Sequence, residues 1–330
     1  MKATTSECVR VTRHGDAQVL QVGEVAVAAP QAGEVRVRHT MIGVNYVDIY
    51  HRSGQFHGDG PNPPFIPGVQ AVGVVEGVGP GVTGWSVGDR VSHAGEGMGS
   101  YVGLRLIAAN RLVRLPEGIT DEVAAASHLR GLTCHYLLTR LHAVQPGETI
   151  LVHAAAGGVG QMMVQWAKHL GATVIGTVGS QAKADFVRTL GCDHAIVYTA
   201  QDFVAATMQI TAGKGVPVVY DSVGASTFMG SLDCLSPMGI AINYGTASGQ
   251  VEPFALQRLH GKSLSVCRPT LRTWIADPAD LQRASAACFE LLASGAMRIG
   301  IQQVLPLRDA AKAHELLESR QTQGAILLRP

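Results

Sequence analysis

A glycine-rich segment at residues 153–160 has the residue types and spacing needed to hold a phosphate group. It consists of His-Ala-Ala-Ala-Gly-Gly-Val-Gly and continues directly from the apolar run Ile150–His153. Small residues let the backbone approach a pyrophosphate closely, and free N–H groups at a helix N-terminus attract the anion. The segment therefore predicts a cofactor-binding turn that contains Gly157, Gly158, Val159 and Gly160.

The elements on both sides of this turn have the pattern needed to position it. Apolar residues recur at helical spacing after the turn as far as Gly171, and a second apolar run covers Ala172–Val178. The first glycine of the usual G-x-G-x-x-G fingerprint is replaced by Ala155. Glycines also form tight turns for packing reasons alone, but the order strand, turn, helix, strand favours dinucleotide binding.

The residues after the second strand indicate which dinucleotide binds. NAD sites usually place an Asp or Glu there, where it binds the ribose 2′-hydroxyl. This strand instead ends in Val178-Gly179-Ser180, and the first acid is Asp185. Lys183 lies near the turn, with Tyr198 after the next strand. Small residues with a cation suit a 2′-phosphate, so we expect NADPH; the alternative is that Lys183 is an ordinary solvated lysine.

Composition limits the class of protein. The 330 residues are enough for about two domains. The formal net charge of +1 gives no long-range attraction to nucleic acid or to an anionic membrane. No apolar run reaches the roughly 18 residues of a membrane-spanning helix, and the first residues lack the apolar core of a signal peptide. The six scattered cysteines contain no C-x-x-C pair, which favours reduced thiols and a cytoplasmic protein.

The order of elements predicts the fold class. Residues 1–115 contain short strands separated by glycine turns, as in a β-barrel. From about residue 130 to 270, strands rich in Val and Ile alternate with helices, as a doubly wound parallel sheet requires. The tail returns to the first domain. The expected fold is α/β; its predicted elements include a strand at Ile107–Val113, a helix at Ser226–Leu235 and a short strand within Ser263–Cys267.

Several further segments carry a family resemblance that covers nearly the whole chain. They are Ile42–Asp48, His153–Gly160, Gln165–Lys168, Gly176–Ser180, Tyr220–Gly224, Arg268-Pro269 and Glu318–Gly324. With these segments the chain resembles the zinc-free medium-chain dehydrogenase/reductases of the NADPH:quinone oxidoreductase, or zeta-crystallin-like, family. The resemblance implies a GroES-like catalytic domain at residues 1–127, a Rossmann NADPH-binding domain at 128–266 and a C-terminal return to the catalytic domain at 267–330.

The resemblance also implies that the protein uses no metal. Zinc-dependent relatives carry Cys where this chain has Asn45, and Gly-His-Glu where it has Gly68-Val69-Gln70. A valine cannot coordinate zinc. Other departures are that relatives often place an acid at Gln70 and Lys at Arg130, and that His128 replaces an apolar residue. These departures concern substrate preference more than cofactor binding.

Site residues follow by carrying the family's motifs onto matching positions. At the nicotinamide end, between the domains, the resemblance implies Asn45, Tyr46 and Tyr50 as catalytic residues, although both tyrosines could simply pack within the small domain. The implied cofactor contacts are Gly158 and Val159 at the pyrophosphate, Gly179, Ser180, Lys183 and Tyr198 at the 2′-phosphate, Ser222, Tyr244 and Gly245 along the adenosine and ribose, and Arg268 and Arg320 at the edge of the cleft.

The expected activity is hydride transfer from NADPH to a quinone, without metal, in the cleft between the domains. The Asn45 amide could hydrogen-bond the cofactor or polarise the carbonyl of the acceptor. Two alternatives stay open: a reductase of enone or enal C=C bonds, and a non-catalytic NADPH- or RNA-binding crystallin-like protein. We also expect a homodimer, because the strand within Ser263–Cys267 would form the edge of a sheet and related reductases pair this edge across a two-fold axis.

Overall fold

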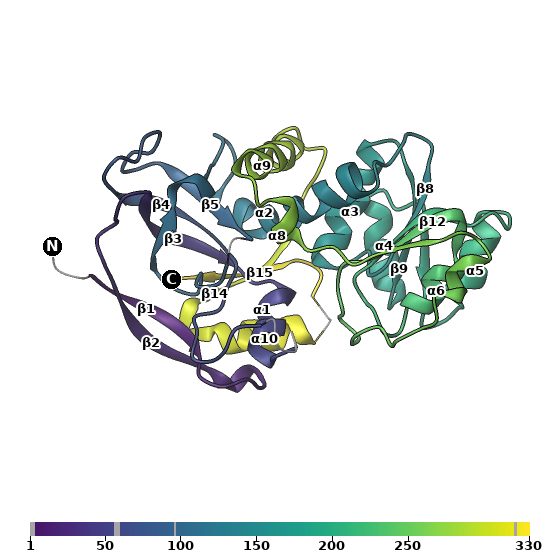
Figure 1. The fold of residues 1–330 in the computed structure, drawn as a ribbon, viewed down its shortest axis with the longest axis horizontal. Helices are drawn as coiled ribbons and strands as arrows, with labels where there is room; N and C mark the ends of the chain where they lie inside the picture. The colour runs from purple at the N-terminus through teal and green to yellow at the C-terminus, as the bar shows by residue number, and fades with distance from the viewer. Residues whose placement is uncertain (1–3, 56–59, 96, 320–321) are drawn as a thin grey trace. The chain divides into compact units, whose positions relative to one another are not determined.

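The structure is a computed structural model that describes residues 4–55, 60–95, 97–319 and 322–330. The chain divides into two compact units (Figure 1). Unit 1 comprises Met1–Leu132, Ile275–Ala293 and Ile299–Pro330, and unit 2 comprises Thr133–Trp274 and Ser294–Arg298. The domain boundaries predicted at residues 127 and 266 remain predictions.

Unit 2 is built on a six-stranded parallel sheet with the order β10-β9-β8-β11-β12-β13. This order reverses beside β8, as in a doubly wound fold, so the predicted Rossmann-type sheet is confirmed. Right-handed crossovers place α3 and α4 on one face of the sheet and α5 and α6 on the other. The strands are β8 Thr149–Val152, β9 Thr173–Val178, β10 His194–Val197, β11 Val216–Asp221, β12 Leu235–Asn243 and β13 Ser265–Cys267, and the helices are α3 Gly158–His169, α4 Gln181–Thr189, α5 Phe203–Ile210, α6 Phe228–Asp233, α7 Gln257–His260 and α8 Leu271–Trp274.

Unit 1 contains the predicted β-rich fold, and its main sheet has the order β14-β15-β3-β4-β5-β7. The C-terminal strand β15 pairs antiparallel with β3, so the yellow end of the chain lies against a purple strand in Figure 1. The strands are β1 Thr4–Val11, β2 Leu20–Val27, β3 Glu34–Gly43, β4 Gln70–Val78, β5 Arg90–Ala94, β6 Leu104–Ala108, β7 Val113–Arg114, β14 Ile301–Pro306 and β15 Ala325–Arg329, and the helices are α1 Tyr46–Ser53, α2 Asp121–His135, α9 Pro278–Ala293 and α10 Ala310–Glu318.

Two predicted elements were wrong in extent. The strand expected at Ile107–Val113 is interrupted by a 3₁₀ turn at Ala109–Arg111, where the Trp85 indole donates to the Ala109 carbonyl (3.0 Å). The helix expected from Ser226 begins only at Phe228, because the Thr227 hydroxyl bonds the Asp221 carboxylate (2.8 and 2.9 Å) and holds the preceding residues in a loop.

Buried aliphatic side chains hold each unit together. In unit 2, residues of β8, β9 and β11 form one core with α6, in which Leu151, Ile175, Val219 and Phe228 are at most 2% exposed.

Within the parts of the chain that the structure describes, no helix is long and apolar enough to cross a membrane.

Candidate functional site

The glycine-rich turn of unit 2 has the geometry of an anion site. Gly160 lies so close to the preceding chain that a Cβ there would be 2.3 Å from the Ala154 carbonyl oxygen. The N-cap of α3 is Gly157, which provides no side chain to bind the first N–H groups of the helix. The neighbouring helices α4 and α5 are capped by the side chains of Ser180 and Asp202. The first turn of α3 can therefore bind phosphate oxygens.

The residues predicted at the 2′-phosphate lie together at the end of β9. The Tyr198 hydroxyl is 2.9 Å from the position that a Cβ on Gly179 would occupy. Ser180 Oγ accepts a hydrogen bond from the backbone N–H of Lys183 (3.3 Å) at the start of α4. The first acid, Asp185, is bonded by Gln181 and Arg188 (both 2.8 Å). Hydroxyl groups and a cation, with the acid held by its own partners, fit a phosphate ester.

Predicted residues at the ends of β11 and β12 also lie close to one another. A Cβ on Gly245 would be 2.7 Å from the Ser222 carbonyl oxygen, so the two loops approach each other closely. The Tyr244 hydroxyl is buried and has no hydrogen-bond partner among the described residues, and burial raises its pKa. Arg268 donates to the Asn243 carbonyl oxygen (2.9 Å). Arg320 lies outside the described residues.

These strand ends are held by a buried polar network that sequence reasoning missed. His153 contacts Thr177 Oγ1 (2.8 Å) through Nδ1 and Ser231 Oγ (3.0 Å) through Nε2. Ser231 in turn donates to Asp221 (3.0 Å), and burial lowers the pKa of His153 although the Asp221 charge opposes the shift. The network joins β8, β9 and β11 at the edge where parallel α/β sheets bind ligands. Its only signal in the sequence is a polar residue at the end of an apolar strand.

In unit 1, Asn45 is the N-cap of α1 and is 6% exposed. Its amide nitrogen donates to the Gly43 carbonyl and to Gln70 Oε1 (both 3.1 Å). Gln70 Nε2 must donate, because its neighbours are the carbonyl oxygens of Ala124 (3.2 Å) and Ala125 (2.9 Å). This fixes the orientation of both amides. Both N–H groups of Asn45 are therefore committed within unit 1.

The two predicted tyrosines lie on successive turns of α1. The rings of Tyr46 and Tyr50 meet edge to face, with centroids 5.4 Å apart. Both residues are partly exposed. The structure thus places Asn45, Tyr46 and Tyr50 along one helix, from its N-cap to its middle, and their catalytic roles remain predictions.

A chain of hydrogen bonds connects α1 to buried residues of other elements in unit 1. Arg52 Nη1 lies 3.2 Å from His314 Nδ1, His314 Nε2 lies 2.9 Å from the Tyr101 hydroxyl, and this hydroxyl donates to Asp48 (3.3 Å). Asp48 also accepts the N–H of Asn45 (2.9 Å). Burial raises the pKa of Asp48 to about 7. Arg52 makes two further bonds to Glu318 of α10 (2.7 and 3.0 Å), so the helix that carries Asn45 is fixed at both ends.

His128, which differs from relatives, is buried away from solvent. Ser285 donates to the Leu281 carbonyl (2.6 Å), so His128 Nε2 must donate to Ser285 Oγ (2.8 Å). His128 Nδ1 then accepts from Ser92 Oγ (2.7 Å). Burial lowers the pKa of His128 to about 3. This histidine is a neutral structural bridge between β5, α2 and α9.

Acid is expected to destabilise the fold through such histidines. Burial lowers the pKa of His39 to about 4 and those of His128 and His314 to about 3, against 6.5 for an ordinary histidine. Below pH 6.5 the unfolded chain binds protons that the folded chain does not, so the free energy of unfolding falls by up to about 1.4 kcal/mol per pH unit for each histidine. Urea denaturation between pH 7.5 and 4.5 measures this slope. His128→Gln should have a shallower slope; an equal slope would contradict the assignment.

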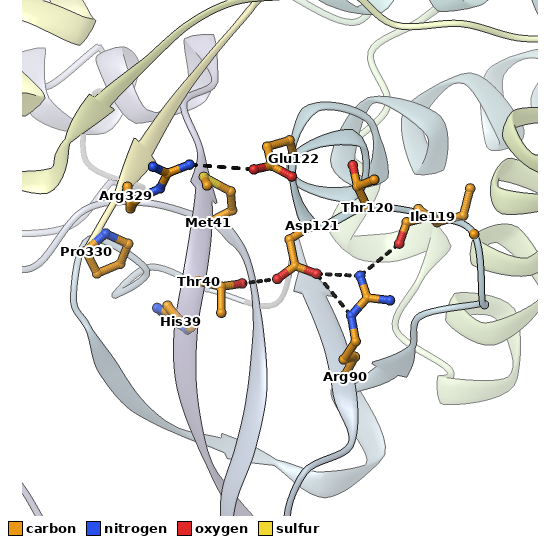
Figure 2. A pocket seen from close by; sticks show the side chains of 11 residues that line it. His39, Thr40, Met41, Arg90, Ile119, Thr120, Asp121, Glu122, Arg329 and Pro330 are labelled. Carbon is orange, nitrogen blue, oxygen red and sulfur yellow. Dashed lines mark hydrogen bonds and ion pairs between the residues drawn. The ribbon is translucent and has the colours of Figure 1, made fainter.

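A pocket of about 670 Å³ lies elsewhere in unit 1 (Figure 2). None of the predicted site residues lines it. Its charged groups bind one another: Arg90 donates to Asp121, and Arg329 lies 3.6 Å from Glu122. A pocket whose charges are already paired offers little to an ionic ligand. Among the residues that the structure describes, no group of three or more His, Cys, Asp or Glu side chains could hold a metal ion.

Comparisons with known proteins match both halves of the chain. Residues 31–117 match a family model described as "Alcohol dehydrogenase GroES-like domain", and residues 158–289 match one described as "Zinc-binding dehydrogenase". The chain is 44% identical over 324 residues to quinone oxidoreductase 1 of Escherichia coli, covering 96% of this chain and 98% of that protein. It is also 44% identical over 315 residues to 2-haloacrylate reductase of a Burkholderia species, covering 93% and 94%.

A solved structure gives the same picture. The crystal structure of Escherichia coli quinone oxidoreductase complexed with NADPH matches with a TM-score of 0.94 and 43% identity, over 99% of this chain and all of that chain. The chain is thus similar to these reductases along its whole length.

Proposed function

The chain belongs to the quinone oxidoreductase family of the medium-chain dehydrogenase/reductases, and on this basis we propose that it transfers hydride from NADPH to a quinone. The observation that carries the proposal is 44% identity, over nearly the whole length, to a quinone oxidoreductase. The open N-terminus of α3 and the cluster of Gly179, Ser180, Lys183 and Tyr198 support it, because they fit a dinucleotide with a 2′-phosphate.

NADPH supplies the hydride when it is bound. The protein's own contribution is to bind and orient the reactants in a site that excludes water. Unit 2 provides the phosphate contacts, and we propose that Asn45, Tyr46 and Tyr50 of unit 1 face the nicotinamide end. Gly157, Gly158, Val159 and Gly160, together with Ser222, Tyr244, Gly245, Arg268 and Arg320, are proposed to complete the contacts to the cofactor.

Oxidation of NADPH, followed by its absorbance, tests the activity. The acceptors are 1,4-benzoquinone, 9,10-phenanthrenequinone, a linear enone and a 2-haloacrylate. We expect turnover with the quinones to exceed turnover with both C=C acceptors. Faster reduction of the enone or haloacrylate would overturn the choice of quinone, and cofactor binding without turnover of any acceptor would indicate a binding protein.

We predict that activity does not require zinc. Asn45 and Val69 stand where zinc-dependent relatives carry metal ligands, and neither an amide nor a valine replaces Cys or His as a zinc ligand. Metal analysis of the purified protein should find no stoichiometric zinc, and incubation with a chelator should leave the rate unchanged. About one zinc per chain, lost together with activity, would contradict this prediction.

We propose a homodimer formed through the edge of the unit 2 sheet. Strand β13 pairs with β12 on one side, and within the described residues no strand pairs with its other side. Val266 on β13 is 39% exposed, and Met238 on β12 and Leu256 before α7 are 81% and 74% exposed. An apolar, unpaired sheet edge is suited to pairing with a second copy.

Val266→Lys is therefore expected to convert the dimer to a monomer, because a lysine on an edge strand opposes pairing. Light scattering at micromolar concentration measures the mass. The control is Val87→Lys in unit 1, where the wild-type valine is 69% exposed and lies far from this edge in the sequence; it should stay dimeric. A monomeric wild-type protein would overturn the proposal.

We further propose that the protein works in the cytoplasm. All six cysteines are free, and five of them are buried. Free thiols in this number suit a reducing compartment.

A further inference from the structure

A hydrogen-bond donor assists the reduction of a quinone, and the amide of Asn45 does not supply one. Negative charge develops on a quinone oxygen as the hydride arrives, and a donor directed at this oxygen lowers the barrier. Both N–H groups of Asn45 are bound to Gly43 and Gln70, so its amide can only accept. Other donors near the N-terminus of α1 are the hydroxyl groups of Tyr46 and Tyr50, which are neutral, and one cationic side chain of α2.

Arg130 on α2 has a free donor next to this position. Its Nη2 donates to the carbonyl oxygen of Val44 (3.3 Å), the residue before Asn45. Its Nη1 is buried and has no hydrogen-bond partner among the described residues. The whole side chain is only 6% exposed. A buried donor without an acceptor is destabilising, so such groups are rare in folded proteins and require an explanation.

The charge of Arg130 is also not neutralised by contact. No described carboxylate forms an ion pair with it, and the side chain that bridges Asn45 to α2 is Gln70, a neutral amide. Burial lowers the pKa of Arg130 to about 10 and the charge of Asp48 opposes this shift, so the guanidinium stays protonated at neutral pH. A desolvated cation forms stronger hydrogen bonds to an anionic oxygen than a neutral donor does.

We propose that Arg130 is a catalytic residue, whose Nη1 donates a hydrogen bond to the quinone oxygen that becomes negative during reduction. The proposal rests on the proposed function. One hydrogen and its bonding electron pair leave NADPH, which becomes NADP⁺, and the quinone becomes the hydroquinone anion. A proton from water then gives the hydroquinone, and Arg130 keeps its own proton throughout. We therefore expect the protein to prefer acceptors in which the negative charge formed by hydride transfer is localised on one oxygen atom.

Two variants of Arg130 and one control test this role. Arg130→Gln removes the charge, Arg130→Lys keeps it, and Arg114→Gln removes an exposed charge of unit 1. Rates are measured on quinones of decreasing electrophilicity. For Arg130→Gln we expect a loss of about a hundredfold on the poorest acceptor, as when one oxyanion donor is removed, and a smaller loss on 1,4-benzoquinone. Arg130→Lys should recover part of the loss, and Arg114→Gln should match wild type.

A second measurement does not depend on turnover. A nitrophenol bound together with NADP⁺ imitates the hydroquinone anion, and its absorbance reports its ionisation. Wild type should lower the pKa of the bound phenol, Arg130→Gln should not, and Arg130→Lys should do so in part. The Kd for NADPH should be unchanged in all three variants.

The outcomes that overturn the role of Arg130 are distinct from failure of the proposed function. Equal losses on every quinone with an unchanged phenol pKa, or wild-type behaviour of Arg130→Gln, would overturn it. If Arg130→Gln does not fold, the phenol titration of wild type decides, because a bound phenol whose pKa is not lowered in wild type would also overturn the role of Arg130. If wild type reduces no quinone, the proposed function fails, whereas the phenol titration still decides on Arg130.

Discussion

Lys183→Ala is expected to lower the preference for NADPH over NADH by about ten- to a hundredfold. One charge-assisted hydrogen bond to phosphate contributes about 1.5–3 kcal/mol, which corresponds to this range of affinity. Lys183 stands in the first turn of α4, beside Ser180 and close in sequence to Gly179, whose neighbour is the Tyr198 hydroxyl. The Kd of each cofactor, measured by titration for wild type and variant, gives the ratio.

The matched control is Lys214→Ala, which removes an exposed lysine elsewhere in unit 2. It should leave both Kd values at the wild-type level. An unchanged NADPH to NADH ratio in Lys183→Ala would show that the 2′-phosphate is bound by other groups.

Gly160→Ala is expected to weaken NADPH binding by at least about tenfold and to destabilise unit 2 by about 1–3 kcal/mol. The added Cβ would lie 2.3 Å from the Ala154 carbonyl oxygen and 2.8 Å from the Cα of Ala155. Both neighbours are backbone atoms, so the turn itself must move, and the first N–H groups of α3 move with it. Thermal melting and NADPH titration measure the two effects.

Gly261→Ala provides the control for the loss of a glycine. Gly261 has a right-handed backbone with a φ of −61°, and no atom lies within 4 Å of the position of its Cβ. This change should be neutral or stabilise the protein by about 0.4–1 kcal/mol, because alanine restricts the unfolded chain. If Gly160→Ala has the same melting temperature and the same Kd for NADPH as Gly261→Ala, the turn does not hold the pyrophosphate as described.

The fold was predictable where its signals are local. The turn around Gly160, the apolar strands on either side and the cation at Lys183 lie within about one βαβ unit, and their spacing alone predicts how they are arranged. Helix α1 was missed because it is short and polar on one face. It forms because the Asp48 carboxylate accepts the backbone N–H of Asn45 and the backbone N–H of Asp48 donates to the Asn45 carbonyl. Arg52 also bonds to His314 and Glu318, which lie near the C-terminal end of the chain.

The chemistry of unit 1 was less predictable, because its polar contacts join residues that are far apart in the sequence. The sequence indicates that Asn45 is an amide, but not that Gln70, 25 positions later, takes one of its N–H groups. Nor does any local pattern indicate that Arg130 reaches the carbonyl of Val44, 86 positions earlier. Which polar groups meet depends on long-range packing, and the direction of each hydrogen bond depends on all the partners together.

The pairing of β15 with β3 also sets the order in which the chain can fold during synthesis. Unit 2 is almost one uninterrupted stretch, so all six of its strands have been synthesised once residue 267 has been added. Strand β3 is made early, yet Ile42 and Gly43 pair with Leu328 and Leu327, which are among the last residues made. Domains fold as units during translation. Unit 1, whose synthesis begins first, can therefore complete its fold only after unit 2, because β3 pairs with β15 only when the C-terminus has been made.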